Sequence, residues 1–125
     1  MKKQVFIIIK PGFLKYSKII LDKFKRKGWN IVRIKTKKLL LSEAKRLYSI
    51  HKNEKFYTPL CNYMSSDLSI GIIIEKQTSE DPFKEVGEIK DYFRKKYAES
   101  EMRNVLHSSD SQEHMDKEMY TYFWQ

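Results

Sequence analysis

Cysteine is nearly absent from this chain, because Cys61 is the only one among its 125 residues. A single cysteine cannot form an intrachain disulfide, so the sequence suits a reducing compartment and we expect a cytoplasmic protein. Histidine is also scarce, with three in the chain, and no cluster of histidine and cysteine offers a zinc site. The four glycines form no glycine-rich phosphate-binding loop, which excludes the nucleotide-binding proteins built on that loop.

Long hydrophobic runs are missing as well. The apolar run near the N-terminus, residues 5–9, is followed directly by Lys10 and Pro11. A run of this length is too short for a membrane span or for the hydrophobic region of a signal peptide. We therefore expect no membrane segment, and we interpret the run as a buried strand.

Acidic residues are outnumbered, since 25 lysines and arginines face 16 aspartates and glutamates and the net charge is +9. Such a charge favours polyanionic partners, which are nucleic acid, nucleotides or an acidic membrane surface. Charge alone does not choose among them, and a lysine-rich composition without any binding role stays an alternative. Aromatic residues make up 14% of the chain, so disorder is excluded, and the length suits a single domain over residues 1–125.

Hydrophobic periodicity and turn residues divide the chain into strands and helices. Strands are predicted at residues 4–9, 29–39, 68–75 and 119–124, and helices at residues 16–28, 42–52, 59–66, 81–98 and 111–118. The expected boundary residues are Ser17, Gly28, Ser42, Pro59, Asp81, Pro82 and Ser111. The serines are interpreted as N-caps, the glycine as the end of a helix, and the prolines as helix starts.

The order of these elements is strand–helix–strand, then helices, then a second strand–helix–strand. Two β-α-β halves of this kind are typical of an α+β ferredoxin-like sandwich. We expect a four-stranded, mainly antiparallel sheet with helices packed on one face. The strand at residues 29–39 alternates apolar and polar residues, which predicts one face in contact with water.

The stretch RNVLHSSDS at residues 103–111 follows no clean helical or strand period. It holds His107, with Asn104 three residues before it and a hydroxyl-rich, acidic run after it. One interpretation is a surface loop that caps the next helix. The other is a reactive imidazole with its supporting groups, since neutral imidazole is a good nucleophile near pH 7. His51 and His114 have no such neighbours in the sequence, and we expect both at the surface.

Several short motifs occur in a specific order along the chain. They are IIIKPG, LYSIHKNEKFYTPLCNYMSS, FRKKYAESEMRNVLHSSDS and an acidic pair ahead of MYTYF. Together they resemble the nucleoside diphosphate kinase family, and the histidine motif is the most specific part of the match. The resemblance implies a ferredoxin-like fold and transfer of the γ-phosphoryl group from a nucleoside triphosphate to a nucleoside diphosphate. It also implies a ping-pong cycle through phosphohistidine, with Mg²⁺ carried on the nucleotide phosphates.

The same resemblance implies which residues are catalytic. His107 would be the nucleophile, and Glu118 and Ser109 match the residues that support it. A carboxylate in that position orients the imidazole and stabilises the positive charge that builds during attack. Asp110 matches an acidic residue near Mg²⁺ that acts through water.

The nucleotide-binding residues are also implied by the resemblance. Lys10 and Arg94 match the phosphate-binding cations, whose charges suit a transition state with dispersed negative charge. Asn104 matches the residue that binds the sugar 3′-hydroxyl, and Tyr48 a tyrosine that contacts the phosphates or supports the nucleophile. Phe56 matches the aromatic ring on which the base stacks, and stacking accepts every base.

The match is weakest between Glu75 and Arg94, where the chain is several residues shorter than the family pattern. The family's second arginine, a threonine and a long loop between subunits have no obvious counterpart there, and Lys84 or Lys90 is a candidate for the missing positive charge. A homo-oligomer built from dimers is still implied. An alternative function is a catalytically weak or inactive relative that binds nucleotides or nucleic acid, and a small interaction domain is a third.

Overall fold

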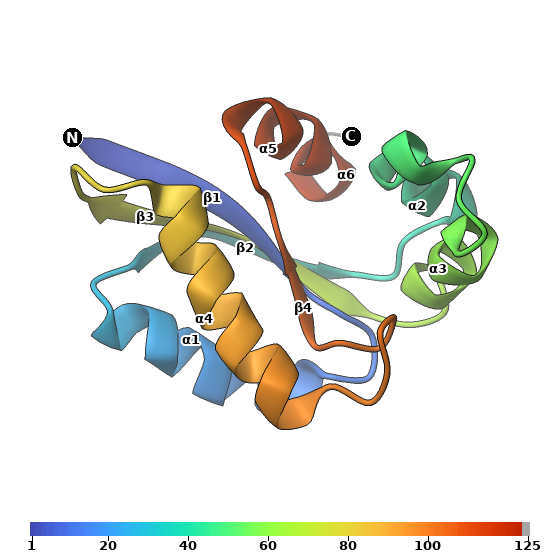
Figure 1. Ribbon diagram of the computed structural model, residues 1–125, viewed down its shortest axis with the longest axis horizontal. Helices are drawn as coiled ribbons and strands as arrows, with labels where there is room; N and C mark the ends of the chain where they lie inside the picture. Colours follow the sequence, from blue (N-terminus) through green and yellow to red (C-terminus); the bar gives the residue numbers. More distant parts are fainter. Residues whose placement is uncertain (124–125) are drawn as a thin grey trace.

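The computed structural model describes residues 1–123, and a four-stranded sheet lies at its centre (Figure 1). The strands are β1 (Lys2–Ile9), β2 (Asn30–Lys37), β3 (Ser69–Gln77) and β4 (Leu106–Ser108), in the order β2-β3-β1-β4. Every pairing between them is antiparallel. The predicted α+β, ferredoxin-like class with a four-stranded antiparallel sheet is confirmed.

Helices flank this sheet. They are α1 (Ser17–Arg26), α2 (Leu41–Leu47), α3 (Tyr57–Met64), α4 (Pro82–Tyr97), α5 (Gln112–Glu118) and α6 (Tyr120–Phe123), with short 3₁₀ turns at Leu14–Tyr16 and Ser49–His51. Within residues 1–123, no helix combines the length and the apolar character needed to cross a bilayer.

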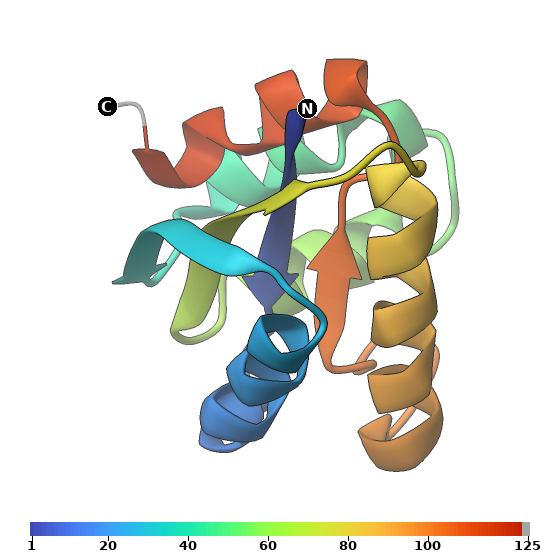
Figure 2. The ribbon, with the colours of Figure 1, turned by 90° about the vertical axis from the view of Figure 1, so that its left-hand side faces the viewer.

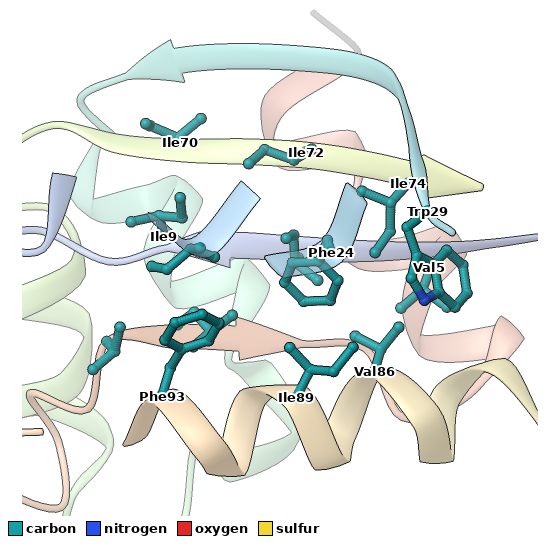
Figure 3. Close-up of a cluster of buried hydrophobic side chains, with 14 of the residues drawn as sticks. Val5, Ile9, Phe24, Trp29, Ile70, Ile72, Ile74, Val86, Ile89 and Phe93 are labelled. Carbon is teal, nitrogen blue, oxygen red and sulfur yellow. The ribbon is translucent and has the colours of Figure 1, made fainter. Parts of the chain in front are cut away.

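Helices cover both faces of the sheet, which corrects the expectation of helices on one face only (Figure 1 and Figure 2). On one face, Val5 of β1 packs in a cluster with Phe24 of α1 and Phe93 of α4 (Figure 3). On the other face, Phe6 and Ile8 pack with residues of α2, α3, α5 and α6. The central strands β1 and β3 are apolar at successive positions, so both of their faces must be buried.

The predicted C-terminal strand at residues 119–124 is wrong. Tyr120–Phe123 form helix α6, the last position of the prediction lies outside the described residues, and the fourth strand is β4. A short apolar and aromatic run does not distinguish helix from strand by its period. Tertiary packing decides for the helix, because Tyr122 packs over Gly71 and shares a hydrogen bond of 2.5 Å with Ser69.

The predicted helix boundaries are correct in part. Asp81 and Ser111 cap α4 and α5 through side-chain hydrogen bonds to backbone N–H groups. Gly28 follows α1 with a φ of +93°, a conformation that favours glycine. Ser17 and Ser42 are not N-caps, because Tyr16 and Leu40 occupy the cap positions and both serines lie inside their helices.

The edge strand β2 is largely exposed on both faces, not on one face as predicted. Val32 and Ile34 are 44% and 51% exposed. An irregularity in the pairing with β3 falls between Ile31 and Arg33, where the register shifts. An edge strand has a neighbour on one side only, so its side chains are covered less than those of a central strand.

Gly71→Ala is expected to destabilise the fold by about 2 kcal/mol, because a Cβ at this position would lie 2.5 Å from the buried Tyr122 ring. Gly87→Ala is the matched control, since a Cβ at that position in α4 meets nothing within 4 Å. Alanine there should instead stabilise the helix by about 1 kcal/mol. Urea unfolding measures both changes, and a Gly71→Ala protein as stable as the wild type would refute the packing argument.

Candidate active site

A cavity of about 510 Å³ lies where β1 ends and brings together residues that are far apart in the sequence. Its wall comes from the residue after β1, the α2–α3 segment, the end of α4, β4 and α5. Nearly all of the predicted site residues line it, and they are Lys10, Tyr48, Phe56, Arg94, Asn104, His107, Asp110 and Glu118. Ser109 is the exception, because it is buried behind the wall.

Strand β4 places His107 in this cavity. Its neighbours Leu106 and Ser108 are buried, and side chains alternate along a strand, so His107 points to the opposite face. The chain enters β4 through Val105, which is fully buried at a φ of +81°. This conformation is rare for a β-branched residue. The backbone N–H of Lys10 donates to the Val105 carbonyl at 2.9 Å, which helps to hold the strained residue in place.

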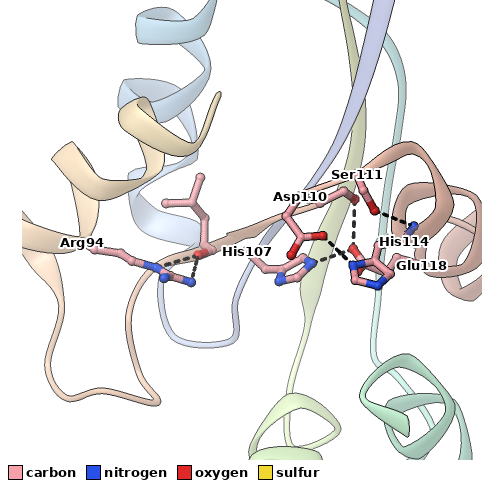
Figure 4. Close-up of polar contacts among 8 residues, drawn as sticks. Arg94, His107, Asp110, Ser111, His114 and Glu118 are labelled. Carbon is pink, nitrogen blue, oxygen red and sulfur yellow. Dashed lines mark hydrogen bonds and ion pairs between the residues drawn. The ribbon is translucent and has the colours of Figure 1, made fainter. Parts of the chain in front are cut away.

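Glu118 orients the imidazole of His107 through a hydrogen bond of 2.6 Å between Nε2 and Oε1 (Figure 4). Ser109 donates to the same carboxylate oxygen at 2.9 Å. An ionised carboxylate accepts hydrogen bonds only, so Nε2 carries the proton and Nδ1 carries the lone pair. Nδ1 forms no hydrogen bond to any residue in 1–123. The arrangement therefore presents one nitrogen of a well-held imidazole as a nucleophile.

Lys10 brings a positive charge into a buried position. The residue is 4% exposed, and its Nζ donates to Asn104 Oδ1 at 2.6 Å. Burial, followed by the positive charges of Arg94 and Lys90, lowers the pKa of Lys10 to about 7. Because the protein does so little to neutralise the charge of this buried ammonium group, the group is well suited to bind an anionic ligand.

Arg94 and Tyr48 add further polar groups to the wall. Arg94 donates from Nε and Nη2 to the Leu106 carbonyl at 3.2 and 3.0 Å, which holds the guanidinium beside β4. The Tyr48 ring meets the His107 ring edge-on, with centroids 6.3 Å apart. The Tyr48 hydroxyl is buried and has no hydrogen-bond partner among the described residues. Leaving a buried hydroxyl unpaired is costly, so a ligand oxygen would be a favourable partner.

Phe56 and Asn104 lie where a base and a sugar could be bound. Phe56 precedes α3 and is 43% exposed, so a face of its ring is open to a planar ligand. Asn104 donates from Nδ2 to the Glu101 carbonyl at 2.7 Å and accepts from Lys10. These contacts orient the amide next to the buried cation.

Comparison with known protein families then identifies the chain. The family model described as nucleoside diphosphate kinase matches residues 3–125. The chain belongs to the nucleoside diphosphate kinase family. The predicted family and enzyme class, a nucleotide-binding kinase that transfers a phosphoryl group, are confirmed.

Curated relatives and a solved structure agree with this assignment. The nucleoside diphosphate kinase of Saccharolobus solfataricus is 33% identical over 97% of this chain and 94% of that protein. Nucleoside diphosphate kinase 1 of Protochlamydia amoebophila is 32% identical over 97% of this chain and 92% of that protein. A crystal structure of the Aquifex aeolicus nucleoside diphosphate kinase matches with a TM-score of 0.85 and 25% identity, over 95% of this chain and 93% of that one.

All three histidines of this kinase line the same cavity, where His51 and His114 are partly exposed. Both lie at the surface, as expected, but their place beside the predicted site residues was not expected. The His51 ring lies beside Phe56, with centroids 5.2 Å apart. His114, in the first turn of α5, bonds to Asp110, which lies just before the cap of that helix. The sequence could have indicated that both histidines lie near the site. His51 falls between two predicted nucleotide-binding residues, and His114 follows Asp110 by four positions.

The connection between β3 and α4 consists of residues 78–81 and contributes no residue to the cavity wall. Lys84, one candidate for the missing positive charge, is exposed on the first turn of α4 and lies outside the cavity wall. Lys90, the other candidate, is half-buried, and burial lowers its pKa. The charges that act on Lys90 include those of Arg94, Asp110 and Glu118. Of the two lysines, Lys90 is therefore the one near the site.

Proposed function

We propose that this nucleoside diphosphate kinase transfers the γ-phosphoryl group in two half-reactions, through a phosphohistidine at Nδ1 of His107. The observation that carries the proposal is the hydrogen bond of 2.6 Å between His107 Nε2 and Glu118 Oε1. This bond supports one tautomer and one ring orientation, in which Nδ1 is the nucleophilic nitrogen. The cavity beside it supplies the charges and the aromatic ring that a nucleotide needs.

In the first half-reaction, the Nδ1 lone pair attacks the γ-phosphorus, and the bond to the oxygen bridging the β- and γ-phosphates breaks. The nucleoside diphosphate leaves with that electron pair. The proton on Nε2 stays in place, and the carboxylate of Glu118 stabilises the positive charge that develops on the ring. In the second half-reaction, a β-phosphate oxygen of another diphosphate attacks the phosphorus and restores neutral His107. Ser109 keeps the carboxylate fixed in both steps.

Catalysis by this arrangement depends mainly on position and charge. Lys10 and Arg94 would neutralise the phosphate oxygens, and the Tyr48 hydroxyl would donate to one of them. Burial raises the pKa of Tyr48 well above its usual range, so the phenol keeps the proton that it needs to donate. Lys90 would add charge from the neighbouring turn of α4. Asn104 would bind the sugar hydroxyl while Phe56 stacks on the base.

Magnesium fits this site as an ion carried on the nucleotide phosphates. Among residues 1–123, no group of three or more histidine, cysteine, aspartate or glutamate side chains could hold an ion by itself. Asp110 is 76% exposed at the cavity, and a hydrogen bond from His114 lowers its pKa, so its carboxylate is ionised and open to a metal-bound water. The bound ion would neutralise phosphate charge, and Asp110 would orient its water.

The family forms oligomers, and we expect a homo-oligomer built from dimers. The edge strand β2 supports this expectation, because Val32 and Ile34 leave apolar surface exposed beside unpaired backbone groups. The short connection at residues 78–81 leaves no long loop there to make contacts between subunits. The cytoplasmic location stays a prediction from the sequence.

The proposal is tested by incubating the protein with γ-labelled ATP and Mg²⁺. We expect a label on the protein that is stable to alkali and labile to acid, as phosphohistidine is. A chase with GDP should move the label onto the diphosphate, with no label released as free phosphate. A protein that binds ATP but gains no label would overturn the proposal in favour of a nucleotide-binding relative without the covalent step.

A further inference from the structure

A groove of about 470 Å³ lies between helices α1 and α4, which cover the same face of the sheet (Figure 2). The residues that line it come from the two helices and the residue after α1, and they are Ile19, Lys23, Arg26, Lys27, Tyr92, Phe93 and Lys96. None of them lines the active-site cavity. None belongs to β2, the edge strand that we expect in contacts between subunits. The groove is therefore a surface feature of its own.

The lining of this groove carries positive charge and no negative charge. Four of its seven residues are lysine or arginine, and none is aspartate or glutamate. None of the four forms an ion pair with a carboxylate within residues 1–123. Asp22 of α1 pairs with Lys18 at 3.1 Å, and Glu88 and Asp91 of α4 lie outside the lining. A groove with this charge suits a chain of phosphates, because each neutralised phosphate releases bound counterions.

An aromatic ring lies among these cations. Tyr92 is 46% exposed, and the Nζ atoms of Lys23 and Lys96 lie 4.4 and 5.7 Å from the centroid of its ring. Lys23 belongs to α1 and Lys96 to α4, so both walls of the groove bring a cation to this ring. A base that stacks on the exposed part of the ring would place its phosphates within reach of both ammonium groups. Single-stranded nucleic acid combines an open base with adjacent phosphates in this way.

An anionic membrane suits the groove less well. Ile19 is the exposed aliphatic side chain of the lining, at 46%, and one such side chain is a small anchor for a bilayer. A groove contacts a thin chain along its length, whereas a flat bilayer meets only its rim. The shape and the ring therefore favour a strand of nucleic acid over a lipid surface.

We propose that the groove between α1 and α4 binds single-stranded nucleic acid, with its four cations against the phosphates and Tyr92 stacked on a base. The contacts are to the backbone and to the face of a ring that every base has, so the site should show little sequence preference. The proposal does not depend on the proposed function, because the groove and the active-site cavity share no residue.

The test measures binding of a labelled oligonucleotide of about 12 thymidines by fluorescence anisotropy, with and without saturating ADP and Mg²⁺. The logarithm of the association constant should fall with the logarithm of the salt concentration with a slope of about −3, as four phosphate contacts predict. Lys23→Gln combined with Lys96→Gln should weaken binding about 25-fold at about 0.1 M salt and halve the slope. Lys38→Gln combined with Lys45→Gln is the matched control, since both lysines are exposed and lie outside the groove.

A second variant separates stacking from charge. Tyr92→Leu keeps an apolar side chain but removes the ring, so affinity should fall about tenfold while the salt dependence stays the same. Tyr92→Trp, which restores an aromatic ring, should bind at least as tightly as the wild type. Thermal unfolding of each variant shows whether a loss of binding reflects unfolding.

Three results would overturn the inference. The first is an equal loss in the Lys38→Gln, Lys45→Gln control, which would show attraction to net charge alone. The second is displacement of the oligonucleotide by ADP, which would place it in the active-site cavity. The third is binding to phosphatidylserine vesicles without binding to the oligonucleotide, which would assign the groove to a membrane. A wild type that gains no phosphohistidine but binds the oligonucleotide as expected would count against the proposed function alone.

Discussion

His107→Gln is expected to lower the rate of phosphoryl transfer by about 10⁴-fold or more, because it removes the only nitrogen proposed to attack the phosphorus. Glutamine is polar and of similar length, so it can still donate to Glu118 and leaves little empty volume. The side chain of His107 is 21% exposed, and we expect the change in folding stability to stay below about 1 kcal/mol. Nucleotide affinity should therefore survive while the covalent step is lost.

The measurement combines γ-phosphate labelling of the protein with a coupled assay of ATP and a nucleoside diphosphate. His51→Gln serves as the control for a lost imidazole in the same cavity, and it should still accept the label. An alkali-stable label on the His107→Gln protein would place the phosphoryl group on another residue. In that case the role of the Glu118 hydrogen bond would have to be revised.

Lys10→Met is expected to weaken nucleotide binding by about 100-fold while it stabilises the folded protein. Loss of a buried cation that contacts phosphate removes a charge-assisted interaction of several kcal/mol. The same cation destabilises the protein without its ligand, since burial lowers the pKa of Lys10 from 10.5 to about 7. Methionine has a similar length and no charge, so the free energy of unfolding should rise by on the order of 2 kcal/mol at pH 7.

The pH dependence of both effects has a defined sign. Between pH 7 and 10.5 the unfolded chain binds a proton at Lys10 that the folded chain releases, so wild-type stability rises with pH in this window. The stability of the Lys10→Met protein should not show this rise with pH. Nucleotide binding is expected to show the opposite trend, because the charged form of Lys10 is the one proposed to bind phosphate, and binding above pH 7 must first restore its proton. Wild-type affinity should fall as the pH is raised from 7 to 9, with a smaller fall in Lys10→Met.

Denaturant unfolding and calorimetric titrations at pH 7 and 9 measure these changes. Lys84→Met is the matched control, because Lys84 is exposed on α4 and lies outside the cavity wall. It should leave both stability and affinity nearly unchanged. A Lys10→Met protein that binds nucleotide as tightly as the wild type would exclude Lys10 from phosphate binding.

The sequence predicted the parts of the site that are encoded locally or by spacing. The run at residues 5–9 predicted a central strand ahead of Lys10, and the spacing of Asn104, His107 and Ser109 carried the family resemblance. It also predicted the caps Asp81 and Ser111, because capping depends on a side chain and the backbone a few residues away. These features involve neighbours in the chain, so they can be read without knowing the fold.

Other parts of the site depended on residues that meet only in the folded chain. His51 and His114 reached the cavity from separate helical segments, and their roles could not be judged before those segments were placed. The same holds for helix α6, where the space above Gly71 accepts the Tyr122 ring. No local period encodes a partner that lies on another strand.

The sequence by itself determined which reactive groups this kinase contains, since the imidazole, the carboxylates and the cations stand in the family's order. Tertiary structure alone decided how these groups are arranged. Pairing of β4 with β1 turns His107 into the cavity, burial lowers the pKa of Lys10, and helix α5 brings Glu118 to Nε2. The reason is physical: tautomer, protonation and orientation depend on distance and burial, and both are properties of the packed chain.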